Sequence, residues 1–498
     1  MTSVSAEPKG QLPSDKPKGL FILPRGVWPM AFTEFWERFS FYGLQGILSF
    51  YLLFSLAEGG LALNPASASS IIGAYGGCVY LAQLVGAWLG ERILSPARMV
   101  ALGAIIIMAG HLTLAFVPSA LGLGLGLGLI VVGTGALKTN ITSIVGFMAD
   151  TDRTVLRDGI FAWFYMAISF GALIGGIVTA SLQTAVNFHA GFAAAAVGMG
   201  VALVIYLVSW RKLPERARVV AKPLPANKFL IPTLIAAATI AVIVVLVLAG
   251  VVNIDNLAIV TTGVSLAAVA FYFSLVLRSR DVTSAEKRRV AGYFPMFSAN
   301  VLYYALIFQE YTAFAILVAG KVDPFIGSWE FPVAALPSIA IFTAVIITPF
   351  VVRMWQRQGE RQPTAPAKFG TSLLIIGLAF VSLVIVIVLT GEAPIPVLAL
   401  TIFMIVAGCS EIFIGPIGLS LITDIAPNKF KSQLTALNFL TLGLGASLAG
   451  VFGQVYTIVG DATVYFVIVA ATGLIAAAIL FLVRKPLNGL LRTSEPNS

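Results

Sequence analysis

The stretch KFLIPTLIAAATIAVIVVLVLAG occupies residues 228–250 and contains no ionisable side chain after Lys228. A helix needs about 20 consecutive apolar residues to cross the hydrocarbon core of a membrane, and this stretch reaches that length. A second apolar stretch, LAIVTTGVSLAAVAFYFSLVLR, follows at residues 257–278 and carries its charge at the last position. We predict that both stretches are membrane-spanning helices that face lipid or act as a scaffold.

The composition of the whole chain indicates the same class of protein. Of its 498 residues, 58% are hydrophobic and 11% are charged, and the mean hydropathy is +0.96. Soluble domains contain about a quarter charged residues. The apolar runs are long and continuous, whereas the strands of a membrane barrel alternate apolar and polar residues. We predict an all-α polytopic membrane protein with about fourteen spans, centred near Ser40, Gly77, Met108, Val131, Ile168, Val197, Ala238, Ala267, Ala305, Phe342, Ala379, Ile405, Leu442 and Ala471.

The order of these spans predicts two halves. A basic, proline-rich stretch, residues 211–228, separates six spans from the two central ones, and six more follow the basic residues 278–289. Paired six-helix halves with substrate held near the membrane midplane are typical of secondary transporters. The predicted divisions are a cytoplasmic tail (1–26), an N-terminal six-helix bundle (27–212), a linker with two extra helices (213–287), a C-terminal six-helix bundle (288–485) and a second cytoplasmic tail (486–498).

The positions of the positive charges along the chain indicate its topology in the membrane. The net charge is +9, and the lysines and arginines gather in every second loop, with Lys321 as the exception. This positive-inside pattern predicts that both termini are cytoplasmic. It also explains the excess charge, so no nucleic-acid partner is expected. Residues 1–26 lack the apolar core of a cleavable signal, so the first span is expected to be the insertion signal.

Few residues favour metal or enzyme chemistry. Cys78 and Cys409 lie in separate spans without paired spacing, so neither a disulfide nor a metal site is expected. His111 is isolated, and we expect it to have a hydrogen-bonded structural role in preference to proton relay. We see no metal-ligand spacing, no paired aspartates and no histidine beside a nucleophile, so neither an enzyme nor a cofactor is expected.

Ionisable residues inside spans are the main functional signal. Each costs about 2.5 to 3.5 kcal/mol at the membrane centre, so each needs a partner or a wet cavity. Helical periodicity places the charged residues of TEFWERFSFYGLQG (33–46) on one flank that faces the protein interior or a cavity. Capping and snorkelling at a helix end would explain the first glutamate, but not an arginine one turn deeper. The six intramembrane ionisable residues are Glu34, Glu37, Arg38, Lys138, Glu310 and Glu411.

Three of these charges stand alone in their spans. Lys138 and Glu411 lie in opposite halves, and they could form an ion pair that breaks when a cavity opens, or a static structural pair. Glu310 lies in the second half's counterpart of the first span, where a buried carboxyl can take up and release a proton.

Several motifs together resemble the proton-dependent oligopeptide transporters, a branch of the major facilitator superfamily. EFWERFSFYG (34–43) is similar to the ExxERF signature of that family's first span. The two extra central helices are similar to those of bacterial members. Further matching stretches are GAYGGCVYLAQLVGAWLGERIL (73–94), GTGALKTNITSIVG (133–146), FAWFYMAISFGALIG (161–175) and GCSEIFIGPIGLSLITDIAP (408–427).

The resemblance implies roles for these residues. Glu34, Glu37 and Arg38 would form a proton-coupling cluster, with Glu310 as a second protonation site. Arg38 and Lys138 would hold a substrate carboxylate, Glu411 would receive its amino group, and Lys138 and Glu411 would pair as a cytoplasmic gate. The substrate-binding set implied by the resemblance is Arg38, Tyr42, Gln45, Tyr80, Lys138, Ser169, Glu411 and Asn438.

The chain departs from the family pattern mainly in the pocket. Phe41 replaces a tyrosine, Gln45 a basic residue, Ser169 an asparagine and Asn438 a tryptophan. Gln45 removes the cation that would pair with Glu310. The residues implied in proton coupling therefore match the family pattern better than the residues implied in the substrate pocket.

The predicted function is a proton-coupled symporter that imports di- and tripeptides by alternating access. The alternative is a transporter of the same fold with a non-peptide zwitterion or anion as substrate. A membrane-embedded enzyme is less well supported, because no metal-ligand spacing, paired aspartates or histidine beside a nucleophile is found. A receptor or scaffold without flux is also less well supported, because it leaves the intramembrane charges poorly explained. The resemblance places the protein in the bacterial inner membrane, surrounded by lipid, as a multi-pass monomer whose partners are a small peptide and protons.

Overall fold

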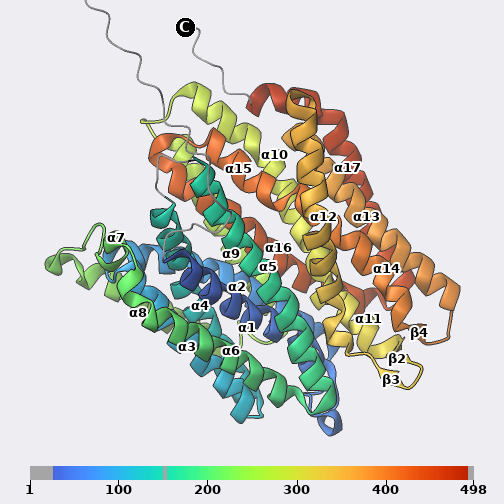
Figure 1. The fold of residues 1–498 in the computed structure, drawn as a ribbon. Coiled ribbons are helices and arrows are strands. Elements are labelled where there is room, and N and C mark those ends of the chain that lie inside the picture. Colours follow the sequence, from blue (N-terminus) through green and yellow to red (C-terminus); the bar gives the residue numbers. More distant parts are fainter. Residues whose placement is uncertain (1–25, 150–153, 492–498) are drawn as a thin grey trace, which may run out of the picture.

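The computed structural model describes residues 26–149 and 154–491, which form two bundles of helices (Figure 1). The first bundle (blue to green) contains α1 (Val27–Leu53), α2 (Pro65–Arg92), α3 (Pro96–Phe116), α4 (Ala120–Met148), α5 (Thr154–Ala185) and α6 (Phe188–Val208). A linker with the short α7 (Glu215–Arg218) leads to the central helices α8 (Leu230–Leu248) and α9 (Leu257–Arg278).

Eight of the described helices form the second bundle (yellow to red). It comprises α10 (Ser284–Ile307), α11 (Ala313–Lys321), α12 (Leu336–Gln358), α13 (Ala365–Thr390), α14 (Val397–Gly408), α15 (Gly415–Ile425), α16 (Lys431–Val459) and α17 (Ala462–Leu491). Strand β1 (Val322–Asp323) pairs in parallel with β4 (Ile395–Pro396), and β2 (Phe325–Ile326) pairs antiparallel with β3 (Trp329–Glu330).

The predicted number of spans agrees with the structure. Within the described residues, 13 helices are long and apolar enough to cross a membrane. Helix α1 is the fourteenth: it is 27 residues long, but Glu34, Glu37 and Arg38 lower its hydropathy. At about 1.5 Å per residue its length still exceeds the hydrocarbon thickness.

Two spans of the second bundle are each interrupted by a 3₁₀ turn. Helices α10 and α11 form one span interrupted by the 3₁₀ turn η4 (Phe308–Tyr311), and α14 and α15 form another interrupted by η7 (Glu411–Phe413). Breaks of this kind are tolerated in a membrane where the backbone lines a cavity. Glu310 lies in η4 and Glu411 begins η7, so each break carries one carboxyl group.

Glycines allow α5 to lie directly against the charged helix α1. A Cβ atom added to Gly175 would lie 2.6 Å from the Cα atom of Phe39, and one added to Gly43 would lie 2.6 Å from the Thr179 methyl carbon. Small residues at a helix contact permit such a close backbone approach. This contact fixes the position of the α1 segment that carries the charges.

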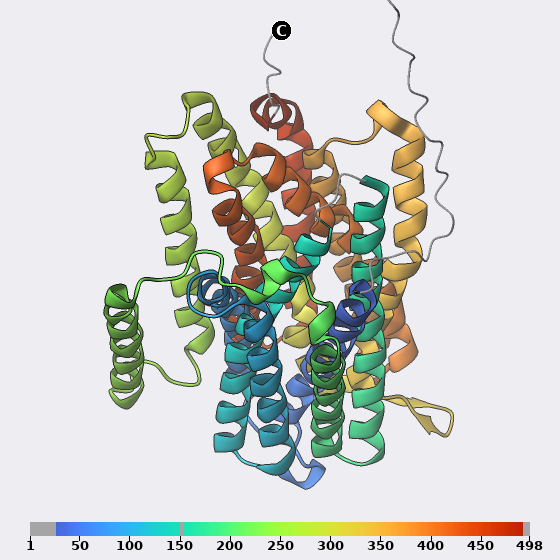
Figure 2. The same ribbon diagram turned by 60° about the vertical axis from the view of Figure 1, so that its left-hand side comes forward.

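Small residues also join the two bundles along α2 and α16. A Cβ atom added to Gly73 would lie 2.6 Å from the Cα atom of Gly450. Helix α9 packs beside this contact, where the Ala258 amide donates to the Ser70 hydroxyl at 3.2 Å. Helix α8 has no buried residue and stands apart from the bundles in Figure 2. The two central helices thus differ: α9 is a scaffold, and α8 presents all its sides outward.

A second set of contacts joins the bundles where α1 ends. The Ser49 hydroxyl donates to the Tyr311 carbonyl at 2.7 Å, and a Cβ atom added to Gly46 would lie 3.0 Å from the Ala334 carbonyl oxygen. Gly176 on α5 faces the Ser338 hydroxyl on α12. We call this region, defined by Ser49, Tyr311, Ala334 and Ser338, the joined end.

Candidate functional site

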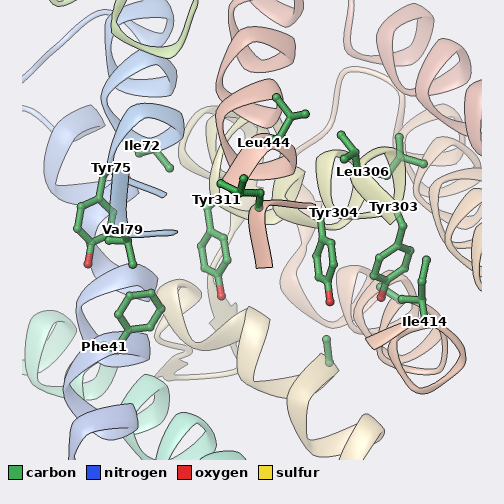
Figure 3. Close-up of a cluster of buried hydrophobic side chains, with 14 of the residues drawn as sticks. Phe41, Ile72, Tyr75, Val79, Tyr303, Tyr304, Leu306, Tyr311, Ile414 and Leu444 are labelled. Atoms are coloured by element: carbon green, nitrogen blue, oxygen red, sulfur yellow. The ribbon is translucent and has the colours of Figure 1, made fainter. Parts of the chain in front are cut away.

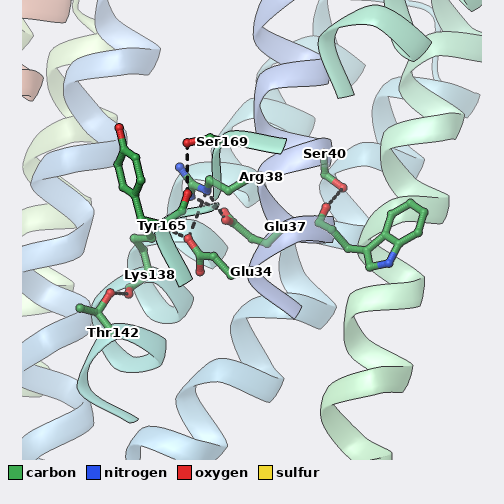
Figure 4. A network of polar contacts seen from close by, with 9 residues as sticks. Glu34, Glu37, Arg38, Ser40, Lys138, Thr142, Tyr165 and Ser169 are labelled. Carbon is green, nitrogen blue, oxygen red and sulfur yellow. Dashed lines mark hydrogen bonds and ion pairs between the residues drawn. The ribbon is translucent and has the colours of Figure 1, made fainter. Parts of the chain in front are cut away.

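The charged residues of α1 form a buried cluster (Figure 4). Glu34, Glu37 and Arg38 are 0%, 2% and 7% exposed, which agrees with the interior orientation predicted from helical periodicity. Arg38 Nη2 donates to Glu37 Oε1 at 2.7 Å, and Arg38 Nε donates to the second oxygen of Glu37. Arg38 Nε also lies 3.5 Å from Glu34 Oε1. This two-point contact fixes the guanidinium plane.

Lys138 completes the cluster from α4. Its Nζ donates to Glu34 Oε1, within the first bundle (Figure 4). Two carboxylates and two cations therefore balance one another, which offsets part of the cost of removing four charges from water. The predicted pairing of Lys138 with Glu411 is not formed in this conformation, and the gate remains a prediction for another state.

A cavity lies between the two bundles. Its lining includes six tyrosines and two glutamates, and it draws on both halves of the chain. Figure 3 shows three of these tyrosines, Tyr303, Tyr304 and Tyr311, with their hydroxyl groups pointing the same way. The polar and ionisable lining residues are Tyr42, Tyr80, Tyr165, Ser169, Tyr303, Tyr304, Glu310, Tyr311 and Glu411.

The breaks in the second bundle explain why two carboxyls reach this cavity. A 3₁₀ turn with helix on either side changes the direction of the chain and exposes side chains at its corner. Glu310 and Glu411 occupy these corners, and both line the cavity. They come from two different spans, so no short sequence motif contains both.

The predicted binding residues divide into two groups. Tyr42, Tyr80, Ser169 and Glu411 line the cavity, as does the predicted protonation site Glu310. Four others do not contribute to its lining: Arg38, Gln45, Lys138 and Asn438.

Arg38 lies behind the aromatic side chains that follow it on α1. Its guanidinium carbon is 4.8 Å from the centre of the Phe41 ring and 5.9 Å from that of Tyr42. Tyr42 lines the cavity, whereas Arg38 itself does not.

Asn438 is packed inside the second bundle and does not line the cavity. It is 4% exposed, and its Oδ1 accepts a hydrogen bond from the Tyr293 hydroxyl at 3.2 Å. Both partners belong to the second bundle, so this bond ties α10 to α16. A substrate contact for Asn438 finds no support in this conformation.

The sequence reasoning missed most of the tyrosines. Tyr165, Tyr303, Tyr304 and Tyr311 line the cavity and were not predicted as site residues. A tyrosine in an apolar span carries a hydroxyl that needs a partner, and that requirement is a usable signal. The Tyr303 hydroxyl, for example, lies 3.0 Å from Ser410 Oγ.

The hydrogen bond expected for His111 is not formed. It is completely buried, and neither ring nitrogen has a hydrogen-bond partner among the described residues. Within the same part of the chain, no group of three or more His, Cys, Asp or Glu side chains is placed to hold a metal ion.

Comparison with known proteins relates this architecture to a transporter family. Residues 97–472 match the model of the POT family. A protein of Bacillus subtilis (strain 168), named uncharacterized transporter YclF, is 32% identical over 484 residues, which is 95% of this chain and 97% of the relative. The di-/tripeptide transporter of Lactococcus lactis subsp. lactis (strain IL1403) is 32% identical over 489 residues, 95% of this chain and 98% of the relative.

Solved structures give the same result. The crystal structure of a peptide transporter POT in complex with sulfate superposes with a TM-score of 0.90 at 31% identity, covering 96% of this chain and 97% of that one. The crystal structure of a POT family transporter in complex with 5-aminolevulinic acid superposes with a TM-score of 0.88 at 29% identity, covering 94% of this chain and 98% of that one. The predicted fold and family are thereby confirmed: the chain is a multi-pass membrane protein that belongs to the POT family.

Proposed function

We propose that this protein is a proton-coupled symporter that imports di- and tripeptides across the bacterial inner membrane by alternating access. The observation that carries the proposal is a cavity between the bundles that contains carboxyl groups and lies next to a buried, charge-balanced cluster. Relatives named as di-/tripeptide transporters cover nearly the whole chain, which supports the substrate class.

The joined end supports a conformation open toward the other side of the membrane. The bundles meet there through Ser49 and Tyr311, near the end of α1 that lies away from Glu34. With both termini in the cytoplasm, as the charge pattern predicts, the joined end is extracellular and the cavity opens inward. Alternating access then requires the contacts of the joined end to break.

Glu310 is placed to couple a proton to that change. It is adjacent to Tyr311, whose carbonyl accepts the Ser49 bond, and its own side chain lines the cavity. Adding a proton removes a charge beside an inter-bundle contact, which alters the relative stability of the two conformations. The cluster of Glu34, Glu37 and Arg38 would supply the second proton-sensitive element.

One proton per substrate is energetically sufficient. A charge gains about 2.3 kcal/mol per 100 mV of membrane potential, and a pH unit adds about 1.4 kcal/mol. Together they support accumulation by roughly two to three orders of magnitude.

Uptake by purified protein in liposomes tests the proposal. Labelled dialanine and trialanine should accumulate when an inward proton gradient is imposed, and Glu310→Gln should abolish this accumulation while leaving counterflow exchange. Glu330→Gln is the matched control, because Glu330 is exposed on β3 and does not line the cavity. Intact driven uptake by Glu310→Gln would remove Glu310 from the coupling mechanism.

The second candidate is a transporter of the same fold for a small non-peptide zwitterion or anion. It is favoured by the POT family structure that contains 5-aminolevulinic acid. Strong competition by that compound, together with no competition by dialanine, would select it.

A further inference from the structure

A basic pocket lies in the second bundle, separate from the cavity between the bundles. It is formed where α17 ends, beside the start of α13 (Figure 1). Arg484, Lys485 and Asn488 line it from α17. Gln362 and Thr364 line it from the segment that precedes α13, and no aspartate or glutamate among the described residues contributes. The pocket therefore presents cations and hydrogen-bonding groups without an anion.

The cations at this pocket have no anionic partner in the described part of the chain. Arg484 and Lys485 are exposed, and neither side chain forms a hydrogen bond or ion pair there. A third cation, Lys368, is 7% exposed and donates from Nζ to Gln362 Oε1 at 3.0 Å. The same Nζ lies 4.1 Å from the centre of the Trp355 ring. Both partners of Lys368 are neutral, whereas buried charges are normally paired, so an anion in the pocket would supply the missing charge.

The start of α13 adds to the attraction for an anion. Thr364 is the N-cap residue of α13, but its side chain makes no capping bond. Its hydroxyl instead accepts a hydrogen bond from Asn488 Nδ2 at 3.0 Å. Ala367, in the first turn of the helix, lines the pocket. The positive end of the helix dipole therefore lies beside the unpaired cations.

The position of the pocket along the spans places it at the level of lipid headgroups. Residues 462–483 of α17 contain no charged residue, and Arg484 follows them directly. Residues 369–390 of α13 are also free of charge, and Lys368 precedes them. Each stretch has about the length that crosses the hydrocarbon core. The two stretches leave that core at the pocket, where phosphate groups of lipids lie.

An apolar flank of α13 leads from the pocket toward the membrane centre. Leu374, Leu378 and Ile385 follow Ala367 at intervals of 7, 11 and 18 residues, which places all four on one side of the helix. The side chains of Leu374, Leu378 and Ile385 are exposed. A ligand with an anionic head and an apolar chain therefore matches both the pocket and the surface below it.

From this arrangement we propose that the pocket binds the phosphate group of an anionic phospholipid whose acyl chain lies along α13. Basic pockets between helices on the cytoplasmic side of a membrane are typical sites for acidic headgroups. The charge pattern of the loops predicts that this end of the bundle is cytoplasmic. Every lining residue belongs to the second bundle, so the site does not depend on how the bundles are placed. The proposal goes beyond the proposed function, because it involves neither the transported substrate nor the proton.

Lipid binding to the purified full-length protein in detergent tests the proposal by native mass spectrometry. The probes are dioleoylphosphatidylglycerol, which is anionic, and dioleoylphosphatidylcholine, which has the same chains and no net charge. The double variant Arg484→Gln with Lys485→Gln should bind phosphatidylglycerol about tenfold more weakly or worse. Without lipid its unfolding temperature should equal that of the wild type, because both side chains are exposed and unpaired in the described structure.

The matched control is Arg211→Gln with Lys212→Gln. These two residues are also consecutive and exposed, and they do not line the pocket. The control should bind phosphatidylglycerol within about twofold of the wild type. Equal affinities of the wild type and the Arg484, Lys485 double variant would overturn the proposal. Equal affinities of the wild type for the two lipids would also overturn it.

Paired substitutions at Asn488 test the electrostatic cause. Asn488→Asp keeps the shape of the side chain but adds a carboxylate to the pocket, whereas Asn488→Leu removes only the hydrogen bond to Thr364. The aspartate should weaken phosphatidylglycerol binding about tenfold more than the leucine does. Equal effects would contradict the charge argument. Inorganic phosphate that raises the unfolding temperature as much as phosphatidylglycerol would assign the pocket to a free anion and overturn the lipid site.

Discussion

The Ser49 hydroxyl on α1 donates a 2.7 Å hydrogen bond to the backbone carbonyl of Tyr311, the residue that follows Glu310 in the chain. The bond is buried and connects the first bundle to the break in the second. The carboxyl group proposed to bind the proton is therefore adjacent to a contact that must break in the proposed transport cycle. This arrangement would couple proton binding directly to the conformation of the joined end.

Ser49→Ala should weaken the joined end. The variant leaves a buried carbonyl without its donor, which costs about 1 to 3 kcal/mol in the joined conformation. The equilibrium should shift toward the state that is open there. Spin labels at the exposed residues Leu56 and Phe325, one from each bundle, should report a larger fraction of long distances.

Ser49→Thr is the control for this change because it keeps the hydroxyl. Thr233→Ala on α8 removes a hydroxyl that bonds within its own helix, so it should leave the distances unchanged. An unaltered distance distribution in Ser49→Ala would show that this bond does not hold the bundles together.

Lys138→Met should destabilise the folded protein. It leaves Glu34 and Glu37 with one cation, and an unbalanced buried charge costs about 3 to 5 kcal/mol. The double variant Lys138→Met with Glu34→Gln removes one charge of each sign and should recover much of the loss. Thermal unfolding in detergent measures both.

The exposed ion pair of Lys429 with Asp281 provides a matched control. Their side chains are 63% and 60% exposed, so solvent screens their attraction. Lys429→Met should not measurably change the unfolding temperature. Equal effects of the two lysine substitutions would contradict the view that burial makes the Lys138 pair important.

Gly175→Ala should impair both stability and coupling. The added methyl group would lie 2.6 Å from the Phe39 Cα atom, so α1 and α5 would have to separate. Overpacking of this kind typically costs about 1 to 3 kcal/mol, and the shift would move Arg38, which is adjacent to Phe39. Unfolding temperature and proton-driven uptake should both fall.

Gly128→Ala on α4 is the comparison for this substitution. No atom lies within 4 Å of the added carbon, so the change should be neutral or stabilising through helix propensity. Uptake that is unaffected in Gly175→Ala would show that close packing of α1 on α5 is not needed for coupling.

Asp255 connects α9 to both bundles. Its carboxylate accepts a hydrogen bond from the Ser67 hydroxyl on α2, and its backbone carbonyl accepts one from the Gln454 side chain on α16. Asp255→Ala should loosen α9 and accelerate proteolysis of the linker before α8. Asn253→Ala, in the same loop but bonded only locally among the described residues, should have a smaller effect. Equal proteolysis of the two variants would contradict this role.

The spans and the interior direction of the α1 charges were determined by the sequence alone. Apolar length predicts a span because hydrocarbon tolerates few polar groups. Burial of Glu34, Glu37 and Arg38 followed because charges on the lipid side of a helix are too costly. Both predictions depend on local composition and on a helical period that neighbouring elements do not change.

Only the tertiary structure decided which groups meet. From the sequence Lys138 was a candidate partner of Glu411, whereas the relative positions of α1 and α4 pair it with Glu34. The breaks that bring Glu310 and Glu411 into one cavity lie in segments as apolar as the unbroken spans. Helices α8 and α9 are both apolar, yet only α9 is packed among its neighbours. These outcomes depend on contacts between residues far apart in the chain, whose energies no local pattern contains.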